Sequence, residues 1–497
     1  MKNNKRKTTK LFIATMLFLS ANLNSATHTV TNGNDAGAGS LRQAVFDANN
    51  GDTIIFVSNV SEVNLTGSDI EIDKDLTIVG GTGDEKTTIY AGSQRIFYVD
   101  VACNLAISNL ILTDANHNSY AGAVLVDYGT FIANNCIFSN NTAVWGGGAV
   151  AVEYGTFIAN NCVFSNNTAG YNGGAVFVGY STFSVTNCTF TNNTAESNGG
   201  AVAVHMFSTF SATNCTFTNN TANYGYGGAV YLLDSSILIA INNTFKNNMA
   251  GVSGGAVFLM GSGSVAINST FKNNIAGYWY GSINGGYFYH CTIDGNKATT
   301  GEGAMYAYFI YNSIITGNTV ADTLNNQIDG NIGGNNLIEG ENGVTRDLVF
   351  GNNTLTDSGY IMPLEYAKTA IRLTVFDIEI PLWMTMTISA DSIISWLQKD
   401  QRGKERPDTG FVTFGAVEYE IVGIVNNYNE TVKIYTLGHN LYLLGDEIKD
   451  AVLYNVLGQK ITEFENSTID LNPLPAGTYI LEYLENDVIK SVKLLRK

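Results

Sequence analysis

Short apolar and polar runs alternate through the middle of the chain, and from Ala121 to Asn274 they recur with a period of about 26 residues. Each copy carries three β-prone runs, which in the second copy cover residues 149–152, 156–159 and 162–164. Glycine and asparagine separate the runs, and no run is long enough for a helix. A fixed period of this size is typical of stacked repeats, in which each copy covers its neighbour.

The pattern predicts an all-β protein: a right-handed parallel β-helix of about a dozen coils, each of about 26 residues, over residues 57–345. Successive coils should lie about 4.8 Å apart, so that residues one period apart stack. Phenylalanines should then form two core columns, one from Phe131 to Phe210 and one from Phe138 to Phe271. Asparagines at bends should form a structural ladder, which comprises Asn135, Asn161, Asn187, Asn214, Asn242 and Asn268.

The segments that flank the repeats have other patterns. Residues 1–26 are expected to be an export signal, because basic residues precede a short apolar core. Residues 27–56 should form an N-terminal cap, with a helix that begins near Ser40 and has Leu41, Val45 and Ala44/Ala48 on one face, followed by a first strand. Residues 346–420 should form a C-terminal cap. Short alternating strands in residues 421–497 predict a small β-sandwich.

Composition narrows the function. The net charge of −17 argues against nucleic-acid binding, and no later stretch is apolar enough to be a membrane helix. Four of the 6 cysteines share one repeat position, where later copies have Asn243 and Ser269. We therefore expect that position to need a small side chain, and the thiols to be buried and free. No histidine accompanies them at ligand spacing, so no metal or other cofactor is expected.

Several segments resemble known bacterial families. The GGA and FxxN copies in residues 121–274 resemble the repeats of polymorphic outer-membrane proteins, a surface adhesin-like β-helix family. The opening VTNGNDAGAGSLRQAV looks like the start of many bacterial surface β-helix proteins, and DQRGKERP with FGAVEYE is similar to the end of the choice-of-anchor Q family. These resemblances imply a surface protein; the membrane barrel of the first family has no counterpart here.

The segment from Val452 to Leu494 strongly resembles the type IX secretion C-terminal sorting domain. This resemblance implies a Bacteroidetes-type bacterium and export across both membranes to the cell surface or the extracellular space. The type IX secretion machinery would be a partner through residues 421–497, and cleavage and anchoring of the mature protein would follow.

Charged residues offer one candidate site. Asp127, Glu153 and His205 fall in one column at the repeat period, beside a column of Tyr128, Tyr154 and Tyr180. The two columns could bind a cation or a glycan; the alternative is a solvated turn with incidental charge. Asp294 and Lys297 have no charged partner one period away. Four residues of the C-terminal cap are interpreted as ion pairs within it: Arg402, Lys404, Glu405 and Arg406.

Two functions fit the sequence. The first is a secreted, surface-attached β-helix that acts as an adhesin or a glycan- or host-surface-binding scaffold without catalytic activity, because the regular zone is nearly free of charge. The alternative is a β-helix polysaccharide lyase or a glycoside hydrolase-like enzyme, which would need clustered carboxylates or calcium ligands.

Overall fold

The computed structural model describes residues 25–339 apart from gaps at 82–84, 261–262, 302, 304, 325–327 and 333–335, together with residue 401 and strands between residues 433 and 496. The expected export signal, up to residue 24, and nearly all of the C-terminal cap lie outside the described residues. The chain divides into two compact units, one of residues 1–362 and 369–418 and one of residues 363–368 and 419–497.

One regular coil contains four strands: β11 (Val124–Asp127), β12 (Thr130–Asn134), β13 (Ile137–Ser139) and β14 (Thr142–Ala143). Each pairs in parallel with its equivalent in the next coil, which are β15 (Val150–Glu153), β16 (Thr156–Asn160), β17 (Val163–Ser165) and β18 (Thr168–Ala169). The first two strands of a coil belong to a 22-stranded sheet, and the others to a 12-stranded and a 10-stranded sheet. The sequence prediction of three strands missed the fourth, which is too short to show alternation.

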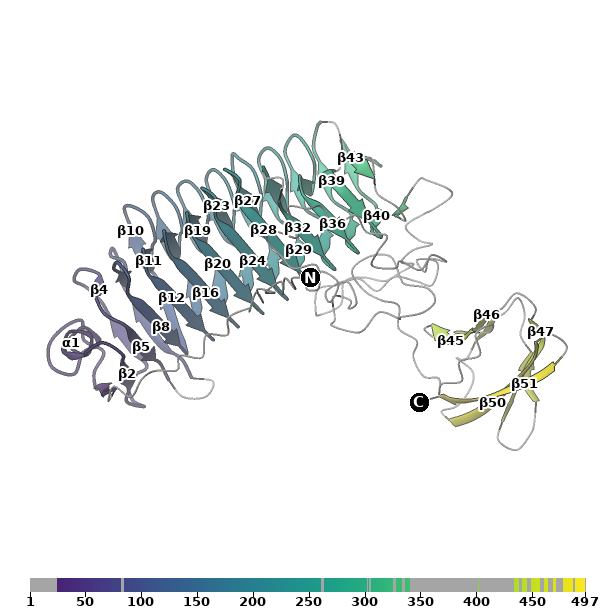
Figure 1. The fold of residues 1–497 in the computed structure, drawn as a ribbon, viewed down its shortest axis with the longest axis horizontal. Helices are drawn as coiled ribbons and strands as arrows, with labels where there is room; N and C mark the ends of the chain where they lie inside the picture. The colour runs from purple at the N-terminus through teal and green to yellow at the C-terminus, as the bar shows by residue number, and fades with distance from the viewer. Residues whose placement is uncertain are drawn as a thin grey trace, which may run out of the picture. The chain divides into compact units, whose positions relative to one another are not determined.

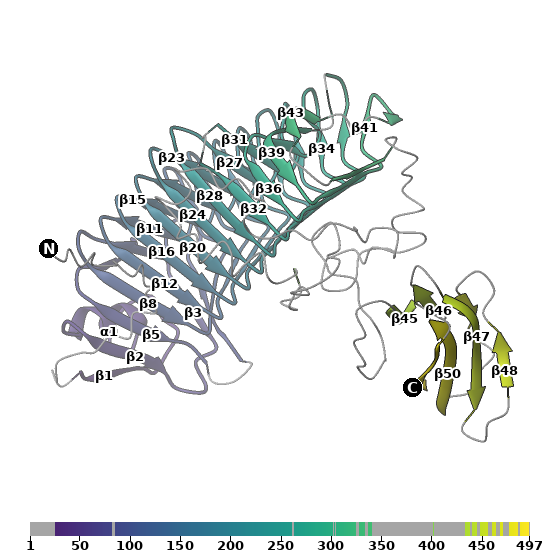
Figure 2. The same ribbon diagram turned by 45° about the vertical axis from the view of Figure 1, so that its right-hand side comes forward.

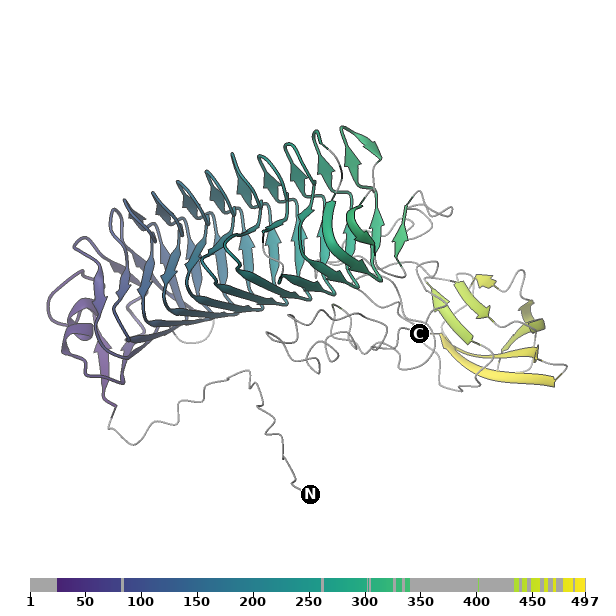
Figure 3. The same ribbon diagram turned by 45° about the horizontal axis from the view of Figure 1, so that its top comes forward.

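The stack of coils is a right-handed parallel β-helix of about 11 turns, so the predicted fold class is confirmed and the number of coils is close to the dozen expected (Figure 1). Successive coils lie in register from the purple to the green end (Figure 3). The 22-stranded sheet continues through β19 (Val176–Gly179), β20 (Thr182–Thr186), β23 (Val202–His205), β24 (Thr209–Thr213), β27 (Val230–Leu232), β28 (Ile237–Ile241), β31 (Val257–Leu259), β32 (Val265–Ile267), β35 (Ile283–Asn284), β36 (Tyr287–Tyr289), β39 (Met305–Tyr311) and β43 (Ile328–Ile332).

The other two sheets follow the same register (Figure 2). The 12-stranded sheet continues through β21 (Thr189–Thr191), β25 (Thr216–Thr218), β29 (Thr244–Lys246), β33 (Thr270–Lys272), β37 (Thr292–Asp294), β40 (Ile314–Thr316) and β44 (Leu337–Ile338). The 10-stranded sheet continues through β22 (Thr194–Ala195), β26 (Thr221–Ala222), β30 (Met249–Ala250), β34 (Ile275–Ala276), β38 (Lys297–Ala298), β41 (Thr319–Val320) and β42 (Thr323–Leu324).

The N-terminal coils are less regular than the middle. Helix α1 (Leu41–Asp47) begins where Ser40 Oγ accepts a hydrogen bond from the backbone N–H of Gln43 at 3.2 Å. Leu41, Ala44, Val45 and Ala48 are buried, which is the face that the sequence predicted. The early strands are β1 (Thr27–Val30), β2 (Asp52–Phe56), β3 (Glu62–Asn64), β4 (Ile70–Ile72), β5 (Leu76–Val79), β6 (Thr87–Tyr90), β7 (Phe97–Val99), β8 (Asn104–Ser108), β9 (Leu110–Thr113) and β10 (Asn116–His117).

Two columns of stacked phenylalanine rings fill the core, as the sequence predicted. Neighbouring rings from Phe131 to Phe210 have centroids 4.9 Å apart, and those from Phe138 to Phe271 are separated by 4.6 to 4.8 Å. The columns meet edge to face, since Phe131 and Phe138 are 6.2 Å apart at 89°. Each fully buried ring contributes about 1.5–3 kcal/mol of hydrophobic stabilisation, so the two columns stabilise the core by apolar burial.

The six asparagines of the expected ladder all adopt left-handed backbone conformation, with φ between 51° and 57°. Their side chains link neighbouring coils; for example, Asn187 Nδ2 donates to Asn161 Oδ1 at 3.2 Å. A second asparagine ladder, which the sequence analysis did not identify, is fully buried at the FxxN position. It comprises Asn141, Asn167, Asn193, Asn220, Asn248, Asn274, Asn296 and Asn318.

Members of this buried ladder bond to backbone and to each other. Asn193 Oδ1 accepts from the backbone N–H of Asn167 at 3.1 Å and from its side-chain amide at 3.0 Å. Asn193 Nδ2 donates to the Phe164 carbonyl at 3.0 Å and to Asn220 Oδ1 at 2.9 Å. The ladder therefore satisfies polar groups that the stacked turns would otherwise bury without partners.

The cysteine column is buried and free, as expected: Cys136, Cys162, Cys188 and Cys215. The expectation that its position needs only a small side chain is incomplete. The sulfurs of Cys162, Cys188 and Cys215 each accept the backbone N–H of the cysteine one coil earlier at 3.4 Å. Asn243 Oδ1 and Ser269 Oγ continue this pattern at 2.7 and 3.1 Å. The position therefore selects a hydrogen-bond acceptor.

The second unit contains two antiparallel sheets in the segment where the sequence predicted a small β-sandwich. A 3-stranded sheet contains β45 (Lys433–Leu437), β46 (Asn440–Leu444) and β49 (Thr468–Asp470). A 4-stranded sheet contains β48 (Lys460–Glu463), β47 (Ile448–Asn455), β50 (Gly477–Glu485) and β51 (Val488–Arg496).

Candidate functional site

Four consecutive strands of the 22-stranded sheet carry the candidate charged column. Strands β11, β15, β19 and β23 end on Asp127, Glu153, Gly179 and His205, which are register partners. The first and third residues of each strand are valines that are fully buried in the core. Strand alternation therefore turns the last residue outward. The structure aligns Asp127, Glu153 and His205, with Gly179 between the glutamate and the histidine.

The column of acids is longer than the sequence analysis found. Ile72, Val99 and Val126 are successive register partners, and each is followed by an aspartate. We call the resulting set the carboxylate column: Asp73, Asp100, Asp127 and Glu153. The early coils lack the GGA and FxxN residues, so Asp73 and Asp100 were missed. Their nearly constant spacing along the chain was the available signal.

Glu153 shows how the column charges affect one another. Burial raises the pKa of the Glu153 carboxyl, and the negative charge of Asp127 raises it further. Burial also raises the pKa of the Tyr120 hydroxyl, and Glu153 adds to that shift. The outer face of these coils is therefore a region of uncompensated negative potential.

A row of tyrosines immediately follows the column at the tight turn between the two strands of each coil. Tyr128, Tyr154 and Tyr180 have φ of 55°, 51° and 50°, a left-handed conformation that is unfavourable for a bulky side chain. Their rings stack at 4.5 and 4.8 Å, with 6° between planes in both pairs, and they are 51%, 45% and 47% exposed. We call these residues the tyrosine row.

The next coil has other large side chains in place of the tyrosine. Its turn contains Met206 and Phe207, both with positive φ, and Phe207 is 73% exposed. The apolar surface thus extends past Tyr180, and at each of these turns a large side chain points to solvent. Exposed apolar rows of this kind mark interaction surfaces more often than isolated exposed residues do.

On the other side of the carboxylate column lies an outer aromatic cluster formed by Phe177, Tyr231, Phe258, Tyr120 and Tyr226. The His205 ring lies between Phe177 and Tyr231, at centroid distances of 5.4 and 5.5 Å. Burial lowers the pKa of His205, although Asp234 opposes the shift, so the ring is neutral near pH 7. Its Nε2 atom has no hydrogen-bond partner among the described residues.

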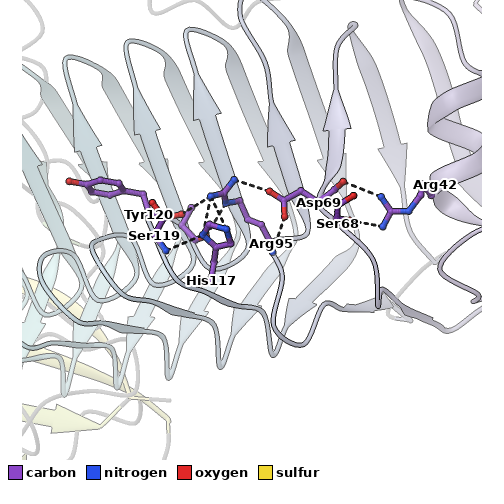
Figure 4. Close-up of polar contacts among 8 residues, drawn as sticks. Arg42, Ser68, Asp69, Arg95, His117, Ser119 and Tyr120 are labelled. Atoms are coloured by element: carbon purple, nitrogen blue, oxygen red, sulfur yellow. Dashed lines mark hydrogen bonds and ion pairs between the residues drawn. The ribbon is translucent and has the colours of Figure 1, made fainter.

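A buried polar network supports the loop that carries Tyr120 (Figure 4). Arg95 donates to Asp69 at 2.8 Å, to the Ala121 carbonyl at 3.2 Å, to His117 Nδ1 at 3.0 Å and to the Tyr120 carbonyl at 3.2 Å. Burial lowers the pKa of Arg95, and the charge of Asp69 opposes this shift. Burial and the charge of Arg95 lower the pKa of His117.

The same network reaches the cap helix. Arg42 on α1 donates to the Ser68 carbonyl at 2.7 Å and to the Asp69 carbonyl at 3.0 Å, and it pairs with Asp35 at 2.7 Å. The sequence analysis missed this network because its members come from loops at irregular spacing. Its guanidinium groups are bonded to protein oxygens and a histidine ring, so we interpret the network as structural support.

Two further ion pairs correct the sequence analysis, which gave Asp294 and Lys297 no charged partner one period away. Lys272 pairs with the buried Asp294, and Thr316 donates to the same carboxylate at 2.9 Å. Lys297 pairs with Asp322 at 2.6 Å. The coils shorten after Asn274, and the partners lie at that shorter or altered spacing.

The expected ion pairs of the C-terminal cap are not among the described residues. Arg402, Lys404, Glu405 and Arg406 lie outside the described residues. Among the residues that the structure does describe, no cluster of His, Cys, Asp or Glu has the arrangement of a metal site. Within the same part of the chain, no helix combines the length and apolar character needed to cross a membrane.

Comparisons with known proteins agree with the fold. Residues 53–245 match a family described as right handed beta helix region. A search of curated proteins found no match. One similar solved structure is the catalytic unit of the thermostable GH87 alpha-1,3-glucanase from Streptomyces thermodiastaticus strain HF3-3. It is 12% identical, with 63% of this chain and 68% of that chain covered and a TM-score of 0.33. So distant a likeness says nothing about activity. By its coils and by this match, the chain is a right-handed parallel β-helix protein.

Proposed function

We propose that this chain is a glycan-binding adhesive protein that uses the outer face of its β-helix as the binding surface and performs no catalysis. The tyrosine row carries the proposal. Three stacked, exposed tyrosines occupy a backbone conformation that costs about 1–2 kcal/mol for an ordinary residue. Strain of this kind is typical of functional positions.

The chemistry beside the row suits a sugar polymer. Aromatic side chains offer apolar area and hydroxyl groups together, and the carboxylates of Asp127 and Glu153 are strong acceptors for sugar hydroxyls. A solenoid repeats these groups at a rise of about 4.8 Å along a straight surface. An extended polymer with repeating units would meet equivalent groups coil after coil.

A glycan array probed with the full chain tests the proposal. We expect binding to a restricted set of glycans, and we expect Tyr180→Gly to weaken it at least about tenfold, a difference of roughly 1.4 kcal/mol. Phe46→Ala is the matched control, because Phe46 is 78% exposed on the cap helix, away from the row. Absence of any bound glycan, or equal losses in both variants, would overturn the proposal.

The Asp127 and Glu153 pair favours one second candidate, a glycoside hydrolase. Residues paired across neighbouring strands are about 5 Å apart, close to the spacing of the two carboxyls in retaining enzymes. The raised pKa of Glu153 is also what a general acid requires. Reducing ends released from a bound glycan, and lost in Glu153→Gln with binding retained, would establish this candidate in place of the first.

Export and surface attachment are also part of the proposal, and they rest on the sorting-domain resemblance of residues 421–497. Expression of the full chain in a bacterium with a type IX system should make it sensitive to protease added outside intact cells. A chain that lacks residues 421–497 should stay protected in the periplasm. Equal protease sensitivity of the two forms would contradict this location.

A further inference from the structure

The coils that carry the tyrosine row contain no lysine or arginine. Between Arg95 and Lys246 the chain has neither lysine nor arginine. The same span contains Asp100, Asp114, Asp127, Glu153, Glu196 and Asp234. The span also contains His117 and His205, and burial lowers the pKa of both histidines. Arg95, which contacts the Tyr120 and Ala121 carbonyls, is buried and paired with Asp69. Among the described residues, an anionic ligand on this face would therefore meet carboxylates and no unpaired lysine or arginine of these coils.

The carboxylates nearest to the row have no ion-pair partner in the described part of the chain. Asp73, at the first coil of the carboxylate column, pairs with Lys74 at 3.3 Å. Among the described residues, no ion pair involves Asp100, Asp127 or Glu153. Three unpaired carboxylates in neighbouring coils, about 4.8 Å apart, repel one another. A bound cation would relieve this repulsion.

From this arrangement we infer that the polymer bound along the tyrosine row is a cationic glycan, one that carries free amino groups on its sugar units. The inference rests on the proposed function and specifies its ligand. Ammonium groups would pair with Asp100, Asp127 and Glu153 while sugar rings contact Tyr128, Tyr154 and Tyr180.

Regular spacing favours a glycan over a basic peptide. The column and the row repeat at a fixed rise. Two neighbouring coils each offer one carboxylate and one tyrosine, Asp127 with Tyr128 and Glu153 with Tyr154, and the coils on either side offer Asp100 or Tyr180 alone. A polysaccharide with one amino group per sugar presents charge and an apolar ring face in the same unit. A lysine-rich peptide supplies the charge without the ring.

Chitosan oligosaccharides test the inference against fully N-acetylated oligosaccharides of the same length and linkage, with titration calorimetry of the full chain near pH 6. We expect the amino form to bind at least about tenfold more tightly than the acetylated form, and the difference to shrink as salt rises. Polygalacturonate, an anionic polymer, should not bind. A lysine oligopeptide of equal charge should bind more weakly than the amino sugar.

Two variants test whether the carboxylate column causes the preference for the amino form. The double substitution Asp127→Asn with Glu153→Gln should abolish the preference for the amino form and leave binding of the acetylated form in place. Asp114→Asn, which removes a charge elsewhere in the same span, is the matched control. It should leave the preference unchanged.

The outcomes separate this inference from the proposed function. Equal binding of both oligosaccharides, or preference for polygalacturonate, overturns the cationic ligand but leaves a glycan-binding protein. Peptide binding as tight as that of the amino sugar overturns the choice of a glycan for this face. Failure to bind any member of this set and of the glycan array overturns the proposed function itself.

Discussion

At the scale of single residues, the asparagine ladder and the tyrosine row share a left-handed backbone but differ in how well their side chains suit it. The bends of the asparagine ladder place a residue that tolerates positive φ where the chain must turn. The tyrosine row places a poorly suited residue at an equivalent kind of turn. The first choice stabilises the coil. Tyrosine at the turns of the row has no structural advantage except ring stacking. We therefore explain these tyrosines by what they bind.

Substitution of Tyr180 by glycine should leave stability nearly unchanged. Glycine removes a left-handed penalty of about 1–2 kcal/mol, while the change loses one ring stack worth about 0.5–1.5 kcal/mol and adds some chain entropy to the unfolded state. These terms nearly cancel, so urea unfolding should give a free energy within about 1 kcal/mol of the parent. A loss well beyond that would mean that the row is structural and would weaken the binding proposal.

The buried asparagine ladder should be far less tolerant. Asn193→Ala leaves the Asn167 N–H and the Phe164 carbonyl buried without this partner, at a cost of about 1–3 kcal/mol for each unsatisfied group. We therefore expect a loss of at least about 3 kcal/mol in urea unfolding. Asn187→Gly is the control at an exposed bend, where glycine accepts the positive φ, and it should cost less than about 1 kcal/mol. Similar costs for both variants would contradict the distinction between the two ladders.

At the scale of elements, each coil is specified by what its side chains offer to the coils on either side. The cysteine column illustrates this. Its sulfurs accept backbone N–H groups across coils, and Asn243 and Ser269 do the same where the cysteine is absent. Comparison of the repeat copies predicted that these cysteines are buried and that their thiols are free. The acceptor role needed the structure, because cysteine is seldom chosen for that purpose.

Cys188 should therefore be replaced more readily by serine than by alanine. Serine retains an acceptor for the Cys162 N–H, as Ser269 does for Asn243, whereas alanine leaves that N–H unpaired at a cost of about 1–2 kcal/mol. Urea unfolding should rank the parent first, then Cys188→Ser, then Cys188→Ala. Reductant should not change the parent, because the thiols are free. A serine variant as unstable as the alanine variant would exclude the acceptor role.

Periodicity explains which elements could be predicted. The phenylalanine columns and the bend asparagines recur at one spacing, so stacking followed directly from the sequence. The two-residue strands such as β14 have no detectable alternation, and the Arg95 network joins loops of irregular length. The candidate site was found in part: Asp127 and Glu153 lie inside the regular zone, and Asp73 and Asp100 lie in coils where the repeat motif is absent.

At the scale of the whole molecule, a solenoid is nearly one-dimensional, because each coil contacts mainly the next one. Local changes in charge should then act locally. The cap and the central coils differ in this respect. Hydrogen bonds hold a carboxyl in its charged form at Asp52, whereas burial and a neighbouring charge disfavour the charged form at Glu153. Acid should therefore destabilise the cap around Asp52 and reduce the charge repulsion around Glu153 in the central coils.

Asp52 makes the cap the acid-sensitive end. The backbone N–H of Asn49, at 2.8 Å, lowers the pKa of the Asp52 carboxyl to about 2, with help from His28 at 2.9 Å and the Ala26 N–H at 2.7 Å. A carboxyl with a folded pKa below its unfolded value of 3.8 stabilises the fold fully above pH 4. That contribution is lost as pH falls from about 4 to 2.

Hydrogen exchange measured across this pH range, corrected for intrinsic exchange rates, should show protection falling first in β1, α1 and β2, while β15 and β19 stay protected. Asp52→Asn should lower protection of the cap near pH 6 and flatten its pH dependence, because the amide keeps the shape but cannot hold the charge. Glu153→Gln is the matched control in the central coils. Its side chain has a raised pKa, so the substitution should remove repulsion and should not weaken the cap. If protection fell uniformly along the β-helix, the coils would be unfolding as one cooperative unit, and the local account of acid sensitivity would be wrong.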